Sequence, residues 1–424
     1  MNRSRGVRGF LAAALVCGLA ARAGAAGTLL IQYTGTGTDH LGGAVAFGDV
    51  NGDGTPDIVV GADGASYVDV YDGTSPATKL YRVTGIVGDA FGSTVETGDV
   101  NGDGRDEVLV GAYAWDGPAG TDQGYVRVFD GPTGTQLFEL QGEKNTDTFG
   151  ASIAVADING DGKGEILVGA PFADDRGTNG NNGYVKLFDG ATQNQLFRWN
   201  GPQHYDEMGR GVAFGDVNND GTKDIVLGAG SGNRIDYGGF VWVQDGANFG
   251  SRLYSFTDGK SHVKPEQNFG FAVAAADMNG DGNADVICGA HRGQTGPART
   301  APTTGYVRVF SGKTGILLYQ LNGEAAGEEF GRYLDAGGDL TGDGIADIGV
   351  GARWAALGGY VKAFDGPTGT QVDRHQADAD FEWLGSSVAI TSGGTSGLRR
   401  MASGAYEGDS RSPNPGGYVR VYQY

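Results

Sequence analysis

Acidic residues recur along this chain at a spacing that suits the binding of a hard cation. The first copy, "DVNGDGTPD", begins at Asp49 and follows the order Asp-x-Asn-x-Asp-Gly-x-x-Asp. Side chains at positions one, three, five and nine can turn inward together, because the glycine at position six permits a sharp bend. Ca²⁺ takes about six to eight oxygen ligands, and the carbonyl at position seven would add another. The spacing therefore predicts a nine-residue calcium loop.

Six copies of this loop place an oxygen-bearing side chain at all four positions. The predicted metal ligands are Asp49, Asn51, Asp53, Asp57, Asp99, Asn101, Asp103, Glu107, Asp157, Asn159, Asp161, Glu165, Asp216, Asn218, Asp220, Asp224, Asp277, Asn279, Asp281, Asp285, Asp339, Thr341, Asp343 and Asp347. In the sixth loop Thr341 replaces asparagine and is a poorer ligand. In the second loop a further acid, Asp106, stands beside the predicted ligands.

Aspartate and asparagine also favour turns without any metal, and this is the alternative explanation of the loops. Six loops that keep an acid at positions one, five and nine favour the metal. Three unpaired carboxylates so close together would repel one another, and a dication removes that cost. The prediction is up to six Ca²⁺ ions with a structural role, because a catalytic metal usually keeps an open position inside a pocket.

A seventh, degenerate copy of the loop has lost its acids. Its sequence "TSGGTSGLRR" places Ser392, Gly394, Ser396 and Arg400 at the four ligand positions. Arg400 puts a positive charge where the other loops have an acid. This loop is predicted to bind no metal.

The loops mark an internal repeat whose first aspartates are 50, 58, 59, 61 and 62 residues apart. Each unit has four strand-like segments, which in the third unit are "FGASIAVA", "EILVGA", "GYVKLFDG" and "NQLFRWNG". Seven such units predict an all-β fold, a seven-bladed β-propeller of four-stranded antiparallel blades. A β-solenoid would use much shorter repeats. The last unit ends at its third strand, so the N-terminal segment 27–35 is predicted to complete the last blade and close the ring.

The chain begins with a segment that is typical of a signal peptide. Residues 1–26 contain a basic start, a short apolar run and small residues for cleavage, which leaves 27–424 as a single propeller domain. Loss of the four arginines in this segment would change the formal net charge from −20 to −24. Such a charge disfavours nucleic acid and anionic membranes as partners. With no later transmembrane run, the sequence predicts a secreted, periplasmic or cell-surface protein.

The two ends of the predicted blades differ in sequence variety. Metal loops are turns between strands 1 and 2, and "DGPTG" marks a uniform turn between strands 3 and 4. The 2–3 and 4–1 loops vary, and varied loops on a rigid scaffold often carry function. Trp115, Trp354 and Trp383 lie in these loops and could stack on sugars or peptides, or cap the blade core. All five histidines are assigned to the same loops: His40, His204, His262, His291 and His375.

These units resemble the FG-GAP repeats of the β-propeller found in integrin alpha subunits. The "FG" element stands at Phe91, Phe149, Phe269 and Phe330, and "GAP" stands at 169–171. The resemblance covers nearly the whole chain after the signal segment. It implies a propeller that binds a ligand in cell adhesion, a task that integrins perform with the help of a second subunit.

The predicted function is a binding or adhesion module that holds a protein or glycan ligand on the varied-loop face. No catalytic residue is assigned and the chain is predicted not to be an enzyme, because it has no nucleophile elbow, zinc motif or phosphate loop. Two alternatives stay open. A hydrolase or lyase acting on polysaccharide would need acids and histidines that converge at the channel mouth, and a purely structural module of a surface assembly would bind no small ligand.

Overall fold

The computed structural model of the chain describes residues 26–174, 180–230, 238–258, 268–293, 303–391, 397–406 and 414–424. Almost all of the predicted signal segment lies outside these ranges, as do His262 and three positions of the seventh loop, Ser392, Gly394 and Ser396. Within them, no helix is long and apolar enough to cross a membrane.

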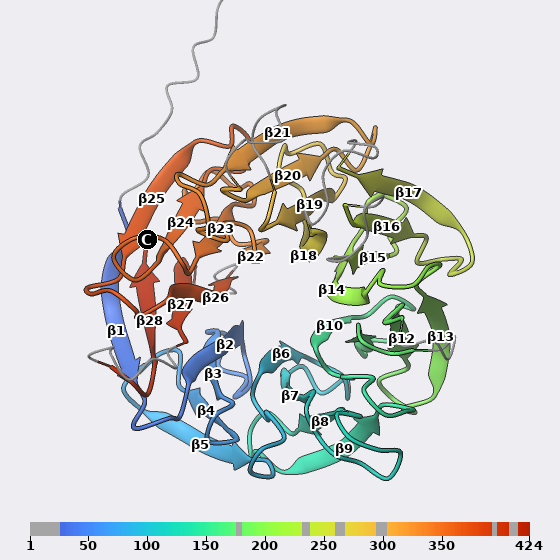
Figure 1. The fold of residues 1–424 in the computed structure, drawn as a ribbon, viewed down its shortest axis with the longest axis horizontal. Helices are drawn as coiled ribbons and strands as arrows, with labels where there is room; N and C mark the ends of the chain where they lie inside the picture. The colour runs from blue at the N-terminus through green and yellow to red at the C-terminus, as the bar shows by residue number, and fades with distance from the viewer. Residues whose placement is uncertain are drawn as a thin grey trace, which may run out of the picture.

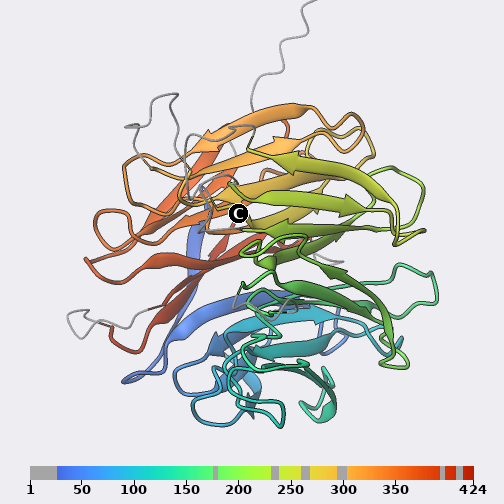
Figure 2. The ribbon, with the colours of Figure 1, turned by 45° about the vertical axis from the view of Figure 1, so that its right-hand side comes forward.

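Seven four-stranded antiparallel sheets form a closed ring, which confirms the predicted propeller (Figure 1). The turned view shows connecting loops that gather at two opposite ends of the blades (Figure 2). From the innermost strand outward, the blades are β2 Leu41–Gly48, β3 Asp57–Ala62, β4 Tyr67–Tyr71 and β5 Lys79–Thr84 (blade 1); β6 Thr94–Gly98, β7 Glu107–Ala112, β8 Tyr125–Phe129 and β9 Gln136–Gln141 (blade 2); β10 Ser152–Ala156, β11 Glu165–Ala170, β12 Tyr184–Phe188 and β13 Gln195–Asn200 (blade 3); β14 Met208–Gly215, β15 Asp224–Ala229, β16 Phe240–Gln244 and β17 Arg252–Thr257 (blade 4); β18 Phe269–Ala276, β19 Asp285–Ala290, β20 Tyr306–Phe310 and β21 Leu317–Asn322 (blade 5); β22 Tyr333–Ala336, β23 Ile348–Ala352, β24 Tyr360–Phe364 and β25 Gln371–Gln376 (blade 6); and β26 Leu384–Thr391, β27 Arg400–Ala405, β28 Tyr418–Gln423 and β1 Thr28–Thr34 (blade 7).

The N-terminal strand closes the ring, as the sequence predicts. β1 pairs antiparallel with β28, from Thr28 opposite Gln423 to Thr34 opposite Tyr418. Tyr33 of β1 is buried, stacks on Tyr71 of blade 1 at 3.9 Å between ring centroids, and donates a hydrogen bond of 2.7 Å to the carbonyl of Pro76. The first strand of the chain therefore joins blade 7 to blade 1.

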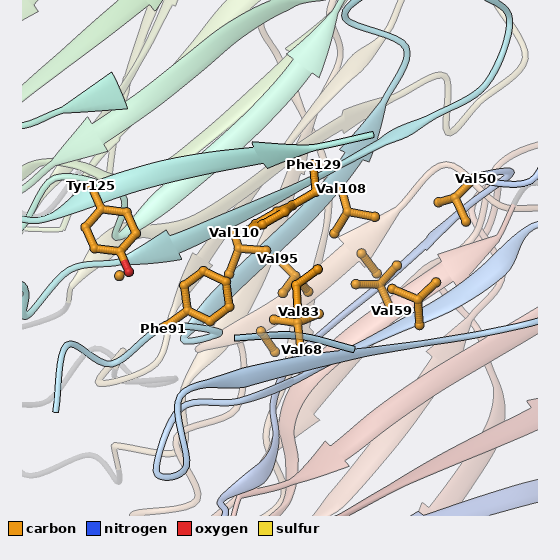
Figure 3. Close-up of a cluster of buried hydrophobic side chains, with 14 residues drawn as sticks. Val50, Val59, Val68, Val83, Phe91, Val95, Val108, Val110, Tyr125 and Phe129 are labelled. Atoms are coloured by element: carbon orange, nitrogen blue, oxygen red, sulfur yellow. The ribbon is translucent and has the colours of Figure 1, made fainter. Parts of the chain in front are cut away.

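Burial along the strands follows their position in the blade. All six residues of β7 are buried, because the second strand packs against a neighbouring blade on both faces. In the outermost strand β9, three of the six residues are exposed and only one is buried. Between blades 1 and 2, Val59 and Val68 pack with Phe91 and Val110 in one apolar cluster (Figure 3). The core of this protein is thus a series of apolar layers between adjacent blades.

The recurring "FG" and "GA" dipeptides have a steric explanation at the contact between blades. Gly92, which follows the buried Phe91, has a φ of 91°, a conformation that L side chains rarely adopt. A Cβ on Gly61 of the neighbouring blade would lie 2.0 Å from the carbonyl oxygen of Gly92. Both glycines are needed for the backbones of two blades to approach this closely.

A second repeated contact ties the 4–1 loop to strand 3 in five of the seven blades, and the sequence analysis missed it. The phenol of Tyr184 donates a 2.7 Å hydrogen bond to Asp147, and that of Tyr360 donates a 2.9 Å bond to Glu328. Each acid stands two residues before the "FG" position or its equivalent, where an acid recurs in six of the seven units. This spacing was the signal that could have revealed the contact.

Candidate metal loops and channel mouth

In the first loop, the side chain of Asp49 organises the backbone. Its carboxylate accepts hydrogen bonds from the amides of Gly52 at 2.9 Å, Asp53 at 3.0 Å and Gly54 at 2.8 Å. The side-chain oxygen of Asn51 accepts from the amide of Asp53 at 2.8 Å. The predicted ligands at positions one, three and five therefore share one tight turn, and loops 2 to 6 repeat the bond from the position-six glycine to the first aspartate.

The acid at position nine is buried in all six loops. Asp57 accepts hydrogen bonds from the amide of Val50 at 3.1 Å and from the amide of Gly73, in the 3–4 turn, at 2.7 Å. Burial, together with the nearby charges of Asp53 and Asp72, raises the pKa of Asp57 to about 7. The position-nine acids of the other loops have raised pKa values with the same leading cause.

A buried acid beside further acids is the environment in which a bound dication lowers the free energy of the folded state. In loop 2, one carboxylate oxygen from each of Asp103, Glu107 and Asp130 lies within 4.8 Å of the others. Oxygen donors of this kind fit Ca²⁺. Asp130 belongs to the 3–4 turn, so the sequence analysis did not include it, although the repeated "FDG" offered a signal.

Neighbouring metal loops are linked by hydrogen bonds. The amide of Asp106 donates to the carbonyl of Asp49 at 3.0 Å, and its carboxylate accepts from the amide of Asp49 at 2.9 Å. The amide of Gly164 in the third loop donates to the carbonyl of Asp99 at 2.7 Å. Asp106 therefore links the second loop to the first.

Arg400 makes a different contact at position nine of the seventh loop. Its side chain is buried, its Nη1 donates a 2.8 Å hydrogen bond to the carbonyl of Gly73 in blade 1, and its Nε donates to Gln423 at 3.0 Å. A buried guanidinium beside this turn disfavours a second cation. The absence of metal from this loop stays a prediction.

The seven innermost strands enclose a central cavity of about 980 Å³. Five of these strands present an alanine at the sixth residue counted from the "FG" position, namely Ala46, Ala154, Ala213, Ala274 and Ala389. The other two present Glu96 and Asp335. Burial, together with the charge of Asp335, raises the pKa of Glu96 to about 8.

The raised pKa of Glu96 predicts a pH-dependent stability. The folded state holds this proton more tightly than the unfolded state, so ionisation of Glu96 destabilises the fold as the pH rises from about 4.5 to 8. In saturating calcium, we expect the free energy of unfolding of Glu96→Gln to rise by about 4 kcal/mol relative to that of the wild type between pH 5 and pH 9. Denaturant unfolding at both pH values measures this gain. If the difference in free energy of unfolding between the two proteins is the same at pH 5 and pH 9, the raised pKa of Glu96 is refuted.

The varied-loop end of this cavity carries an asymmetric group of side chains. The residue after "FG" is small in four blades, namely Gly43, Ser93, Ala151 and Ser386, but in blades 4 to 6 it is Arg210, Phe271 and Arg332. Arg353 follows β23, and both Arg353 and Arg332 donate a hydrogen bond to the hydroxyl of Tyr333. We call Arg210, Phe271, Arg332, Tyr333 and Arg353 the mouth cluster.

The histidines do not converge on the mouth cluster as a group. Of the four histidines within the described ranges, only His291 is placed beside it. Arg332 Nη1 donates to its Nε2 at 3.4 Å, and burial together with the nearby arginines holds its pKa well below the usual value. The assignment of His375 to a loop was wrong. It lies in β25 and stacks on Tyr422 at 3.5 Å, because the outer strand continues to Gln376.

The tryptophans divide between core and surface. Trp115 packs edge-on against the buried Tyr125 at 5.3 Å, as expected of a residue that caps the blade core. Trp354 is 51% exposed, next to Arg353. Only Trp354 therefore offers a largely open ring to a partner.

Comparison with known proteins agrees with this geometry. The model of the FG-GAP repeat matches residues 41–76, 91–129, 149–188, 208–243 and 269–310, which fall in blades 1 to 5. Integrin alpha-V of Gallus gallus is 30% identical over 179 residues, which are 39% of this chain and 17% of that protein. Integrin alpha pat-2 of Caenorhabditis elegans is 31% identical over 239 residues, 50% of this chain and 18% of that protein. The matches thus span less than a fifth of these relatives.

The ring of blades and the matched repeats make this chain an FG-GAP repeat protein. Its β-propeller is of the integrin alpha-like type, as the sequence comparison with the two integrin alpha relatives shows.

Proposed function

We propose that this protein is an exported, calcium-stabilised β-propeller that binds a protein or glycan through its varied-loop face. The observation that carries the binding role is the mouth cluster. Large charged and aromatic side chains from three blades meet at one end of the cavity, whereas four other blades have small residues at the equivalent position. Concave sites with a few convergent polar groups are the usual places for ligands.

The calcium part of the proposal rests on the six loops. Each buries a position-nine acid beside further loop acids, and the backbone around the first aspartate is already wrapped. The metal would hold the 1–2 turns together and would lie at the end of the blades opposite the ligand. The role in adhesion, and any second subunit, come from the likeness to integrin alpha proteins.

Catalysis on polysaccharide is the alternative that the sequence left open. It calls for acids and histidines that converge at the channel mouth. Among the histidines that the structure describes, only His291 is recorded in contact with the mouth cluster, and Arg332 donates to its Nε2. The two acids that contact the cluster, Glu207 and Glu329, are engaged by arginines. The arrangement favours a binding site over general acid–base chemistry.

The binding face can be tested with a matched pair of exposed apolar side chains. Trp354 lies in a varied loop and is 51% exposed, whereas Ile316 lies in a 3–4 turn at the metal end and is 66% exposed. A ligand found by screening extracellular proteins and glycans against the full chain should bind about tenfold more weakly to Trp354→Ala. Its affinity for Ile316→Ala should match that for the wild type. The opposite pattern would place the ligand on the metal end and refute the proposal.

A further inference from the structure

The mouth cluster holds three guanidinium groups close together on aromatic rings. The guanidinium carbon of Arg210 lies 4.2 Å from the ring centre of Phe172 and 5.2 Å from that of Phe271. The guanidinium carbon of Arg332 lies 4.8 Å from the centre of Phe271. Stacking on a flat ring limits the conformations of an arginine while leaving its N–H donors free. The arginines are therefore positioned before any ligand arrives.

The two acids that contact the mouth cluster do not balance the charges of its three arginines. Glu207 accepts a hydrogen bond of 2.8 Å from Arg210. Glu329 is shared, since it accepts from Arg353 at 3.0 Å and from Arg332 at 3.3 Å. Three positive charges thus face two negative charges, and the neighbouring His291 is held neutral by its lowered pKa. A local positive charge remains in a protein whose formal net charge is −20.

Several hydrogen-bond donors of the cluster have no acceptor among the described residues. Arg332 uses its Nε and Nη1, Arg353 uses the same two atoms, and Arg210 uses its Nε alone. The terminal Nη2 groups of all three are left over. The hydroxyl of Tyr333 receives N–H donors from Arg332 at 3.3 Å and Arg353 at 3.4 Å, so its own proton also needs an acceptor. Tyr333, Arg332 and Arg210 line the central cavity.

We propose that the mouth cluster binds the carboxylate of a single aspartate or glutamate side chain presented by a partner protein. This inference rests on the proposed binding function and names the chemistry of its ligand. A carboxylate accepts bidentate hydrogen bonds from guanidinium groups and can take the proton of a phenol as well. The Nη2 groups of Arg332 and Arg353 and the hydroxyl of Tyr333 supply this set.

Charge favours a protein over a polyuronate as the source of the carboxylate. The positive region is small, whereas the whole chain carries a net charge of −20 and repels a polymer with a charge on every sugar. A protein segment can present one acid among neutral or basic residues. The partner is therefore expected to carry an isolated acidic residue on a protruding segment.

The test is a selection of random twelve-residue peptides displayed on phage against the immobilised full chain in calcium buffer. Selected peptides should share an Asp or Glu, and its replacement by Asn or Gln should weaken binding about tenfold or more. The Arg353→Gln variant of the protein should bind the unaltered selected peptides more weakly than the wild type does, to a similar extent. Arg127→Gln is the matched control, because Arg127 forms a comparable half-buried pair with Glu139 at 2.8 Å but lies outside the cluster.

Weak binding by Arg353→Gln could also result from misfolding, so a third variant is needed. Glu329→Gln removes an acceptor that competes with the ligand, so it should tighten peptide binding while the calcium content stays unchanged. Peptides that bind without an acid, or that bind Arg353→Gln normally, would overturn the inference and leave the proposed binding function intact. A selection that yields no peptide, or yields only binders displaced by oligogalacturonate, would also overturn it. Failure of both the peptide selection and the wider protein and glycan screen would count against the proposed function itself.

Discussion

Removal of calcium is expected to lower the melting temperature of this propeller by about 20 °C. A ligand present at about one hundred times its dissociation constant stabilises the folded state by about 2.7 kcal/mol per site. Six such sites would contribute about 16 kcal/mol, which in a domain of this size shifts the midpoint by a degree or more for each kcal/mol. The loss includes the repulsion between acids such as Asp103, Glu107 and Asp130, whose oxygens lie within 4.8 Å of one another.

Thermal unfolding with and without a calcium chelator measures this effect. A single-loop variant, Asp103→Ala, should lower the midpoint in calcium by a few degrees and should lose less on chelation than the wild type. Asp116→Asn serves as the control, because Asp116 is an exposed acid in a varied loop. A midpoint that does not change on chelation would refute the structural role of calcium.

Deletion of the N-terminal strand is expected to cost about 5–10 kcal/mol of folding free energy. Six residues of β1 pair with β28, and the buried Tyr33 packs against Tyr71 of blade 1. Each lost backbone hydrogen bond is worth about 1 kcal/mol, and the burial of one large side chain is worth about 2 kcal/mol. The deletion also exposes β28 as an unpaired edge, which promotes aggregation.

The measurement compares the wild type with a chain that lacks residues 27–34. We expect a fall of several degrees in the melting temperature and a greater tendency to aggregate. Addition of a synthetic peptide of residues 27–35 should restore the midpoint, because it can pair with β28 in the same register. A deleted chain as stable as the wild type would show that β1 does not stabilise the ring.

Local sequence patterns were enough to predict the strands, the number of blades and the closing strand. The second strand is apolar throughout because it is buried on both faces, and this pattern is visible in one short segment such as "EILVGA". The same patterns predicted the wrapped turn around Asp49. Such features depend on residues that are close in sequence, which is why a single sequence reveals them.

The mouth cluster could not be predicted in this way. Arg210, Arg332 and Arg353 come from blades 4 and 6, and they meet only because ring closure brings the ends of the innermost strands together. No fixed spacing links them. The error at His375 has a related cause, since the end of an outer strand depends on packing against Tyr422, which lies in another blade.

The most direct test of the calcium-stabilised propeller is the number of calcium ions bound per chain. Elemental analysis of the purified protein after gel filtration in calcium buffer should give six ions for the wild type and five for Asp103→Ala. Arg400 fills position nine of the seventh loop, so a seventh ion is not expected. A value near zero, or the same value for both proteins, would contradict the account.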